Sequence, residues 1–198
     1  MDGATSSHMK ALIRVIKYVE KTKDYKLVLD PGQETKWEMK AYTESDFAGD
    51  ADNRKSISGF VIYLNGCPLA WRSKQQNSVM LSSTEAEYVA VSEVAMEIIC
   101  ISKLMEFMDL KCKYSIVAHV NNMGAIYMTN TDRMGSRTKH IDTRYHYVRN
   151  YIKDGILNVM FVQLADNKAN LFTKNLGIDD FKRHTRGMFS SRLKQEGC

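Results

Sequence analysis

Apolar and polar positions along the chain alternate between two periodicities, which predicts a fold that mixes helices and strands. Apolar residues recur at helical spacing in several stretches, over 8–20, 82–109, 123–130, 140–154, 167–176 and 179–189. Short apolar or alternating runs are typical of strands and lie at 27–29, 37–44, 57–64, 68–73, 115–120 and 156–164.

The order of these elements predicts a mixed sheet. Asn65-Gly66 separates two strand-like runs and indicates a tight hairpin, because both central residues of a type I′ turn need positive φ. The runs over 37–44, 57–64 and 68–73 are therefore expected to be antiparallel, whereas later strands return through helices and can pair in parallel. We expect an α/β fold with a five-stranded sheet, flanking helices and an extra N-terminal helix and strand.

Composition narrows the class of protein. The 198 residues are 44% hydrophobic and 26% charged, which suits a packed globular domain and excludes wholesale disorder. No apolar run approaches the length of about 18 residues that a membrane span needs, so no membrane partner is expected. The 4 cysteines lack zinc or disulfide spacing and indicate a reducing, cytoplasmic or nuclear location. A net charge of +5 is compatible with nucleic acid as a partner.

A group of motifs then suggests a family. They are YTESDFAGD at 42–50, RKSISG at 54–59, LSSTEAEY at 81–88, SRTKHID at 136–142 and LFTK at 171–174. In this order they resemble the ribonuclease H domain of copia-type LTR retrotransposon (Pseudoviridae) polyproteins. The resemblance implies a ribonuclease H-like domain over 37–177, preceded by a reverse transcriptase tail over 1–36 and followed by a helical extension over 178–198.

The resemblance also implies a chemistry and its residues. Such enzymes cut the RNA strand of an RNA–DNA hybrid with two divalent ions, which activate water and stabilise the leaving oxygen. Magnesium ions need anionic oxygen ligands, which in the family are four carboxylates. These four catalytic positions fall on Glu44, Glu85, Asn121 and Asn170.

The chain departs from that pattern at three of the four positions. Asn121 and Asn170 carry no charge, and two cations about 4 Å apart need the missing negative charges. Glu44 is longer than the family's aspartate and moves its oxygens by roughly 1 Å, enough to cost about a hundredfold in rate. We therefore expect an inactive domain, with no tightly bound cofactor and with Mg²⁺ or Mn²⁺ at Glu44 and Glu85 only if it is active.

Two nearby acids leave an alternative open. Asp46 would share the strand face of Glu44, and Asp166 would share a helix face with Asn170. If they rescue the site, the chain is an active or weakly active endoribonuclease. Glu85 also has a structural interpretation, because Ser82-Ser-Thr-Glu85 is a capping box at a helix start. Asn121 would similarly be a turn residue, and Asn170 a helix surface residue.

Binding does not require the metal-binding acids, because phosphate contacts come mainly from lysine, arginine and backbone N–H groups. The candidate phosphate contacts are Arg54, Arg72, Lys74, Arg137, Lys139 and Arg149. The expected function is thus a catalytically silent module that binds an RNA–DNA hybrid, a duplex or an unidentified protein. Decay, domestication and deliberate substitution would all leave this sequence pattern.

Overall fold

The structure, a computed structural model, describes residues 3, 5–32, 36–113, 115–131 and 142–190. The chain forms two units, Met1–Val28 with Arg186–Cys198, and Leu29–Thr185. The resemblance instead predicts a division into 1–36, 37–177 and 178–198. These boundaries differ from those of the two compact units, and the division stays a prediction.

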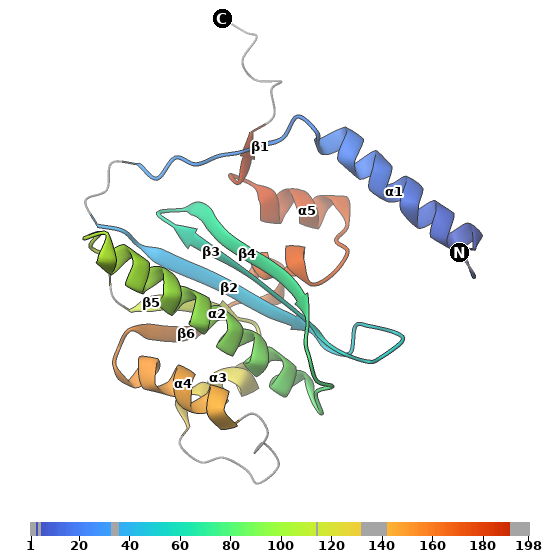
Figure 1. The fold of residues 1–198 in the computed structure, drawn as a ribbon. Coiled ribbons are helices and arrows are strands. Elements are labelled where there is room, and N and C mark those ends of the chain that lie inside the picture. Colours follow the sequence, from blue (N-terminus) through green and yellow to red (C-terminus); the bar gives the residue numbers. More distant parts are fainter. Residues whose placement is uncertain (1–2, 4, 33–35, 114, 132–141, 191–198) are drawn as a thin grey trace, which may run out of the picture. The chain divides into compact units, whose positions relative to one another are not determined.

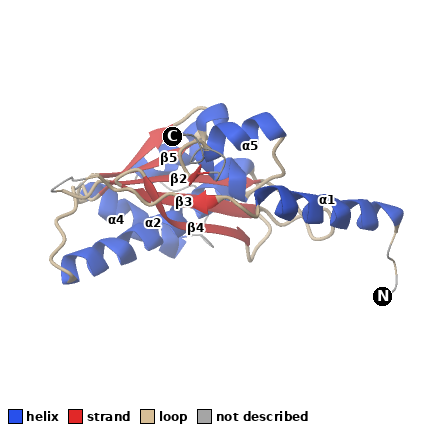
Figure 2. Ribbon diagram, turned by 90° about the horizontal axis from the view of Figure 1, so that it is seen from above, coloured by secondary structure: helices blue, strands red, loops and turns tan. Residues whose placement is uncertain are grey.

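A five-stranded sheet forms the centre of the larger unit and confirms the predicted fold class (Figure 1, Figure 2). Its strands, in spatial order, are β4 (Cys67–Gln75), β3 (Ile57–Leu64), β2 (Met39–Asp46), β5 (Ile116–Val120) and β6 (Leu157–Phe161). The neighbours β2, β3 and β4 are antiparallel, while β5 runs parallel to β2 and β6 runs parallel to β5. Asn65 and Gly66 form the turn between β3 and β4 with φ of 47° and 79°, as the hairpin signal requires.

One face of the sheet packs on helix α2 (Ser83–Phe107) and forms the hydrophobic core. Ala41, Phe60 and Ile62 point to this face and pack with the apolar stripe of α2. Helices α3 (Met123–Asn130) and α4 (Asp142–Lys153) lie beside α2. Since side chains alternate along a strand, Lys40, Tyr42 and Glu44 share the opposite face.

The segment after β6 crosses that opposite face and differs from the prediction. Two 3₁₀ turns, η2 (Leu164–Asp166) and η3 (Lys168–Phe172), replace the α-helix expected over 167–176. Asn167 lies between them in an extended conformation, with its fully buried side chain donating to the Thr43 carbonyl at 2.9 Å. This long-range hydrogen bond fixes the backbone in a conformation that a continuous helix would not permit. Helix α5 (Ile178–Thr185) follows and is shorter than expected.

Glycine at position 59 allows η3 to approach the sheet. Gly59 lies opposite Glu44 in the β2–β3 register. A Cβ atom there would lie 2.7 Å from Thr173 Cγ2 and 2.8 Å from Phe172 Cβ. The missing side chain therefore brings Thr173, and the chain that follows it, up to β2.

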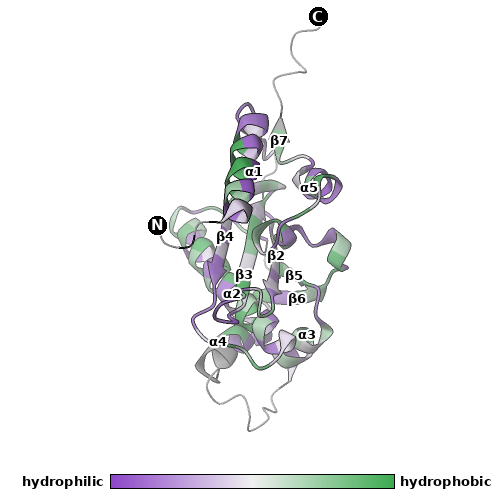
Figure 3. Ribbon diagram, turned by 90° about the vertical axis from the view of Figure 1, so that its right-hand side faces the viewer, coloured by the Kyte–Doolittle hydropathy of each residue, from purple (hydrophilic) through white to green (hydrophobic). Residues whose placement is uncertain are grey.

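The smaller unit consists of one helix and a short strand pair. Helix α1 (Ser6–Thr22) has no buried residue and contains both hydrophobic and hydrophilic residues (Figure 3). Strand β1 (Lys26–Leu27) pairs antiparallel with β7 (Phe189–Ser190), and the rings of Tyr25 and Phe189 lie 6.0 Å apart. The strand predicted over 27–29 is thus shorter than expected, and β7 was not predicted.

We expect Gly59→Ala to lower the free energy of unfolding by about 1–3 kcal/mol, since the added methyl overpacks the contact with η3. Gly177→Ala is the matched control, because a Cβ there meets no atom within 4 Å. Urea unfolding of both variants measures the difference. Equal midpoints for Gly59→Ala and the parent protein would contradict the close approach of η3.

Candidate functional site

A buried carboxylate near the end of β2 is the first group of the candidate site. Glu44 is only 3% exposed. Its Oε2 accepts a hydrogen bond from the Thr173 hydroxyl, and its Oε1 accepts one from the Lys174 ammonium at 2.5 Å. Lys174 reaches solvent but forms an ion pair with the buried acid. Both carboxylate oxygens therefore already have strong donors, and the negative charge is neutralised by a lysine.

A second buried carboxyl belongs to α2, and the sequence analysis missed it. Glu87 is 5% exposed, and burial raises its pKa to about 8. The nearby Glu44 charge raises the pKa of Glu87 further, whereas the Ser45 N–H and the charge of Lys174 lower it. Within the described residues its Oε2 is buried without a hydrogen-bond partner. Glu87 is thus a mostly protonated acid at neutral pH that lies in the field of Glu44.

Glu85, which the resemblance assigned to the site, caps the start of α2, and its role in the site stays a prediction. Its Oε2 accepts a hydrogen bond from the Leu81 N–H at 2.9 Å, and its own N–H donates to Ser82 Oγ at 3.2 Å. These contacts satisfy N–H groups at the helix start. The phase of the apolar stripe could have found Glu87, because this residue precedes buried Val91 and Val94 by four and seven positions.

The two asparagines at family positions belong to a network of amides. Asn121 follows β5, and its Oδ1 accepts from Asn167 Nδ2 at 3.3 Å. Asn170 is buried in η3 and donates to the Leu164 carbonyl at 2.7 Å. Its Oδ1 is buried and has no hydrogen-bond partner among the described residues. These amides connect β5, η3 and β2 without adding charge.

The residues present do not fit a pair of divalent metal ions. Within the described ranges, no three histidine, cysteine, aspartate or glutamate side chains are grouped to hold a metal. The oxygens of Glu44 are occupied, and Asn170 Oδ1 offers one neutral ligand. Asp46 is partly exposed at the end of β2, and Asp166 is exposed in η2. Their rescue of a metal site stays a prediction.

The candidate phosphate contacts fall into three groups. Arg54 is exposed in the β2–β3 turn, and Arg72 and Lys74 lie on the edge strand β4, partly or fully exposed. Arg149 is only 6% exposed and donates to the Met128 carbonyl at 3.3 Å, which places it in the interior rather than on the surface. Arg137 and Lys139 lie outside the described residues.

We expect the stability of the domain to fall as pH rises from about 5 to 8, in part because of Glu87. Its folded pKa of about 8 exceeds its ordinary value of 4.5. The stabilisation is therefore full below pH 4.5 and is lost as pH rises through the folded pKa, at up to about 1.4 kcal/mol per pH unit. Glu87→Gln should flatten this dependence.

Urea unfolding at several pH values measures the effect, with Glu106→Gln at the exposed end of α2 as the control. Burial lowers the pKa values of His119 and His184, so their contribution makes the free energy of unfolding rise with pH up to their ordinary pKa of 6.5. This contribution is the same in all variants. A parallel pH dependence of Glu87→Gln and the parent protein would show that Glu87 is ionised when folded.

Comparisons with known proteins show that the sequence is similar to part of the polyproteins of plant transposons. The chain is 35% identical over 186 residues to the retrovirus-related Pol polyprotein from transposon RE2 of Arabidopsis thaliana, covering 94% of this chain and 13% of that polyprotein. It is 38% identical over 136 residues to the corresponding polyprotein from transposon TNT 1-94 of Nicotiana tabacum, covering 69% of this chain and 10% of that protein. The chain thus spans roughly an eighth or less of these relatives.

Among solved structures, the N-terminal RNase H domain of a Mycobacterium tuberculosis protein, fused to maltose-binding protein, superposes with a TM-score of 0.50. It shares 12% sequence identity, and the match covers 75% of this chain and 96% of that one. No protein-family model matches the chain. In the described part of the chain, no helix is long and apolar enough to cross a bilayer. By sequence and fold together, the chain is a ribonuclease H-like domain of the retrotransposon Pol polyprotein family.

Proposed function

We propose that this ribonuclease H-like domain does not cleave RNA–DNA hybrids and acts instead by binding nucleic acid. The observation that carries the proposal is the ion pair between Lys174 and the buried Glu44. A divalent ion would have to displace Lys174 and Thr173 from this carboxylate before it could bind. Binding would also have to release the proton that Glu87 holds near neutral pH, and Asn170 would add only an uncharged ligand.

The charge balance supports the loss of cleavage. Metal-assisted phosphoryl chemistry uses the ions to neutralise the phosphate and to activate water. Here the ammonium of Lys174 supplies a fixed positive charge 2.5 Å from Glu44, but an ammonium does not activate water as a metal does. Lys174 thus offsets the negative charge of Glu44 as a metal ion would, but it supplies no activated water for cleavage.

Exposed cations support the binding part of the proposal. Arg54, Arg72 and Lys74 reach the surface, and phosphate contacts by such side chains need no metal. The net charge of +5 favours association with a polyanion. An unidentified protein partner is the outcome to consider if nucleic acid does not bind.

A cleavage assay on a labelled RNA–DNA hybrid tests the catalytic half. The native domain should show no cut above background with Mg²⁺ or Mn²⁺. Combined Glu44→Asp, Asn121→Asp and Asn170→Asp substitutions should restore metal-dependent cutting, because they return the negative charges. Asn150→Asp with Asn158→Asp is the control, since it adds the same two charges at exposed positions. Cleavage by the native domain that Glu87→Gln abolishes would overturn the proposal.

Salt-dependent binding tests the other half. Hybrid affinity should fall steeply with salt, and the double variant Arg72→Gln, Lys74→Gln should reduce the slope of log K against log salt by about two, one for each lost phosphate contact. Lys103→Gln with Lys111→Gln removes the same charge from exposed positions and is the matched control. An equal loss in both double variants would assign binding to net charge rather than to β4.

A further inference from the structure

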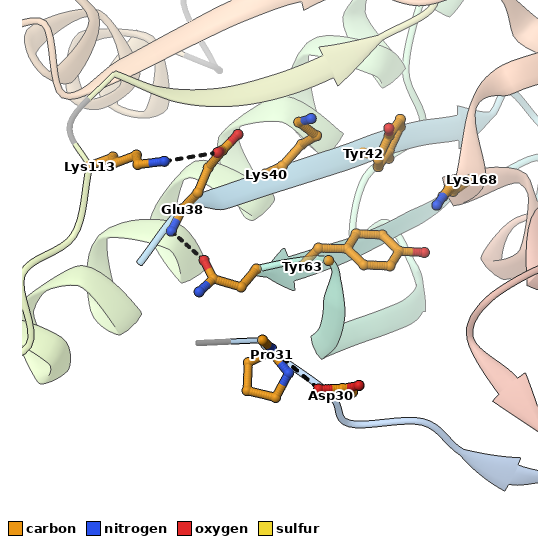
Figure 4. A pocket seen from close by; sticks show the side chains of 11 residues that line it. Asp30, Pro31, Glu38, Lys40, Tyr42, Tyr63, Lys113 and Lys168 are labelled. Atoms are coloured by element: carbon orange, nitrogen blue, oxygen red, sulfur yellow. Dashed lines mark hydrogen bonds and ion pairs between the residues drawn. The ribbon is translucent and has the colours of Figure 1, made fainter. Parts of the chain in front are cut away.

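A pocket of about 540 Å³ lies on the sheet face opposite α2, and Glu44 is not among its lining residues (Figure 4). Lys40 and Tyr42 reach it from β2 and Tyr63 from β3, while Lys168 enters from η3. The segment from Asp30 to Gly32 closes one side. This volume is within the range of about 300–1,000 Å³ that is typical of small-ligand sites.

The floor of the pocket is aromatic, and a lysine lies above it. Lys168 Nζ is 4.5 Å from the centroid of the Tyr63 ring and 5.8 Å from that of Tyr42. Tyr42 in turn stacks on His119 at 4.8 Å and meets Tyr63 edge to face at 6.0 Å. These contacts hold the Lys168 ammonium in one place over buried or half-buried rings.

Among the described residues, no acid pairs directly with either lysine of this cluster. Neither Lys168 nor Lys40 forms an ion pair within the described residues, and burial together with the Lys40 charge lowers the pKa of Lys168. The two phenols do not neutralise it, because burial raises the pKa of both Tyr42 and Tyr63 and keeps them uncharged. Two lysines of like charge therefore line the same pocket beside neutral rings, close enough for Lys40 to affect the pKa of Lys168.

The acids near the two lysines, of which Asp30 and Glu38 line the pocket, form no ion pair with Lys40 or Lys168 among the described residues. Glu38 pairs with Lys113 at 3.5 Å, and Asp30 accepts a hydrogen bond from the Gly32 N–H at 3.3 Å. Asp166 is exposed beside η3 and, after burial, is the second cause of the raised pKa of Tyr42. Among the described residues it forms no ion pair with Lys168. An anion placed between Lys40 and Lys168 would remove their repulsion and replace the water that Lys168 has lost.

We propose that this pocket binds a phosphate group, held between the ammonium groups of Lys40 and Lys168, with a nucleoside filling the remaining volume. A phosphate offers several charged oxygens and can accept from both ammonium groups at once. The phosphate can belong to a free nucleotide or to a nucleic-acid strand. In the second case the inference rests on the proposed binding function and names where a strand phosphate lies.

Titrations followed by amide NMR shifts test this inference with three probes: inorganic phosphate, adenosine monophosphate and a single-stranded hexanucleotide. Saturable shifts should centre on Tyr42, Tyr63 and Lys168. Lys168→Met should weaken binding by about tenfold or more, the loss expected for one charge-assisted hydrogen bond. Lys168→Arg should recover most of the affinity, because it keeps the charge. Lys40→Met should also weaken binding, whereas Lys103→Met should change it by less than about twofold, since Lys103 is exposed on α2 and does not line this pocket.

The three probes separate the sources of the phosphate. Binding of the monophosphate at the strength of the hexanucleotide identifies a free nucleotide, and binding of the hexanucleotide alone identifies a strand. Absence of saturable shifts with every probe, or shifts that survive Lys168→Met and Lys40→Met, would overturn the inference. Monophosphate binding without any hybrid binding would keep this pocket and reject the proposed function, so the two fail separately. Thermal unfolding of each variant checks that the fold is intact.

Discussion

The buried ion pair between Glu44 and Lys174 is the constraint on which the arrangement of the C-terminal half depends. A carboxylate this deeply buried would be costly if left alone, so it must be neutralised or paired. Its partners come from the far end of the domain and reach it only because the 3₁₀ segment η3 crosses β2. Gly59 makes room for that crossing, and Asn167 anchors it through Thr43. The ion pair therefore depends on the path of η3 over β2, and it in turn determines the charge of the candidate site.

The ion pair between Glu44 and Lys174 also determines how the negative charge of this region is offset. Several acids gathered without metal would repel one another and raise each other's pKa. In this chain one acid is paired with a lysine, another carries its own proton, and two positions are amides. The amides of Asn121 and Asn167 also form a hydrogen bond across the site. Protein contacts thus offset the charge of Glu44, while Glu87 Oε2 and Asn170 Oδ1 stay buried without a hydrogen-bond partner among the described residues.

Features set by local chemistry could be predicted, whereas those set by distant contacts could not. Asn65-Gly66 specifies its turn through backbone preference, so the antiparallel strands followed from short-range signals. The break at Asn167 depends on Thr43, which is distant in sequence, and helical spacing alone gave the wrong element there. At the site, Glu44 was named from its motif, but its pairing with Lys174 needs the folded chain. Glu85 was named from the motif and Glu87 was missed; both are buried, and what separates them is the cap contact of Glu85. Arg149 was expected on the surface, but it is buried in the folded chain.

The position of β4 at the outer edge of the sheet has a consequence for how copies of the chain behave at high concentration. A nine-residue edge strand presents unpaired backbone groups that could add the strand of another molecule. Trp71 is exposed on this strand and would favour such self-association. Arg72 and Lys74 flank that surface with like charges, and the register shift between β3 and β4 at Ile62/Tyr63 perturbs the regular ladder next to this edge. The same cations that we propose to contact nucleic acid thereby also oppose aggregation of the domain through its own sheet edge.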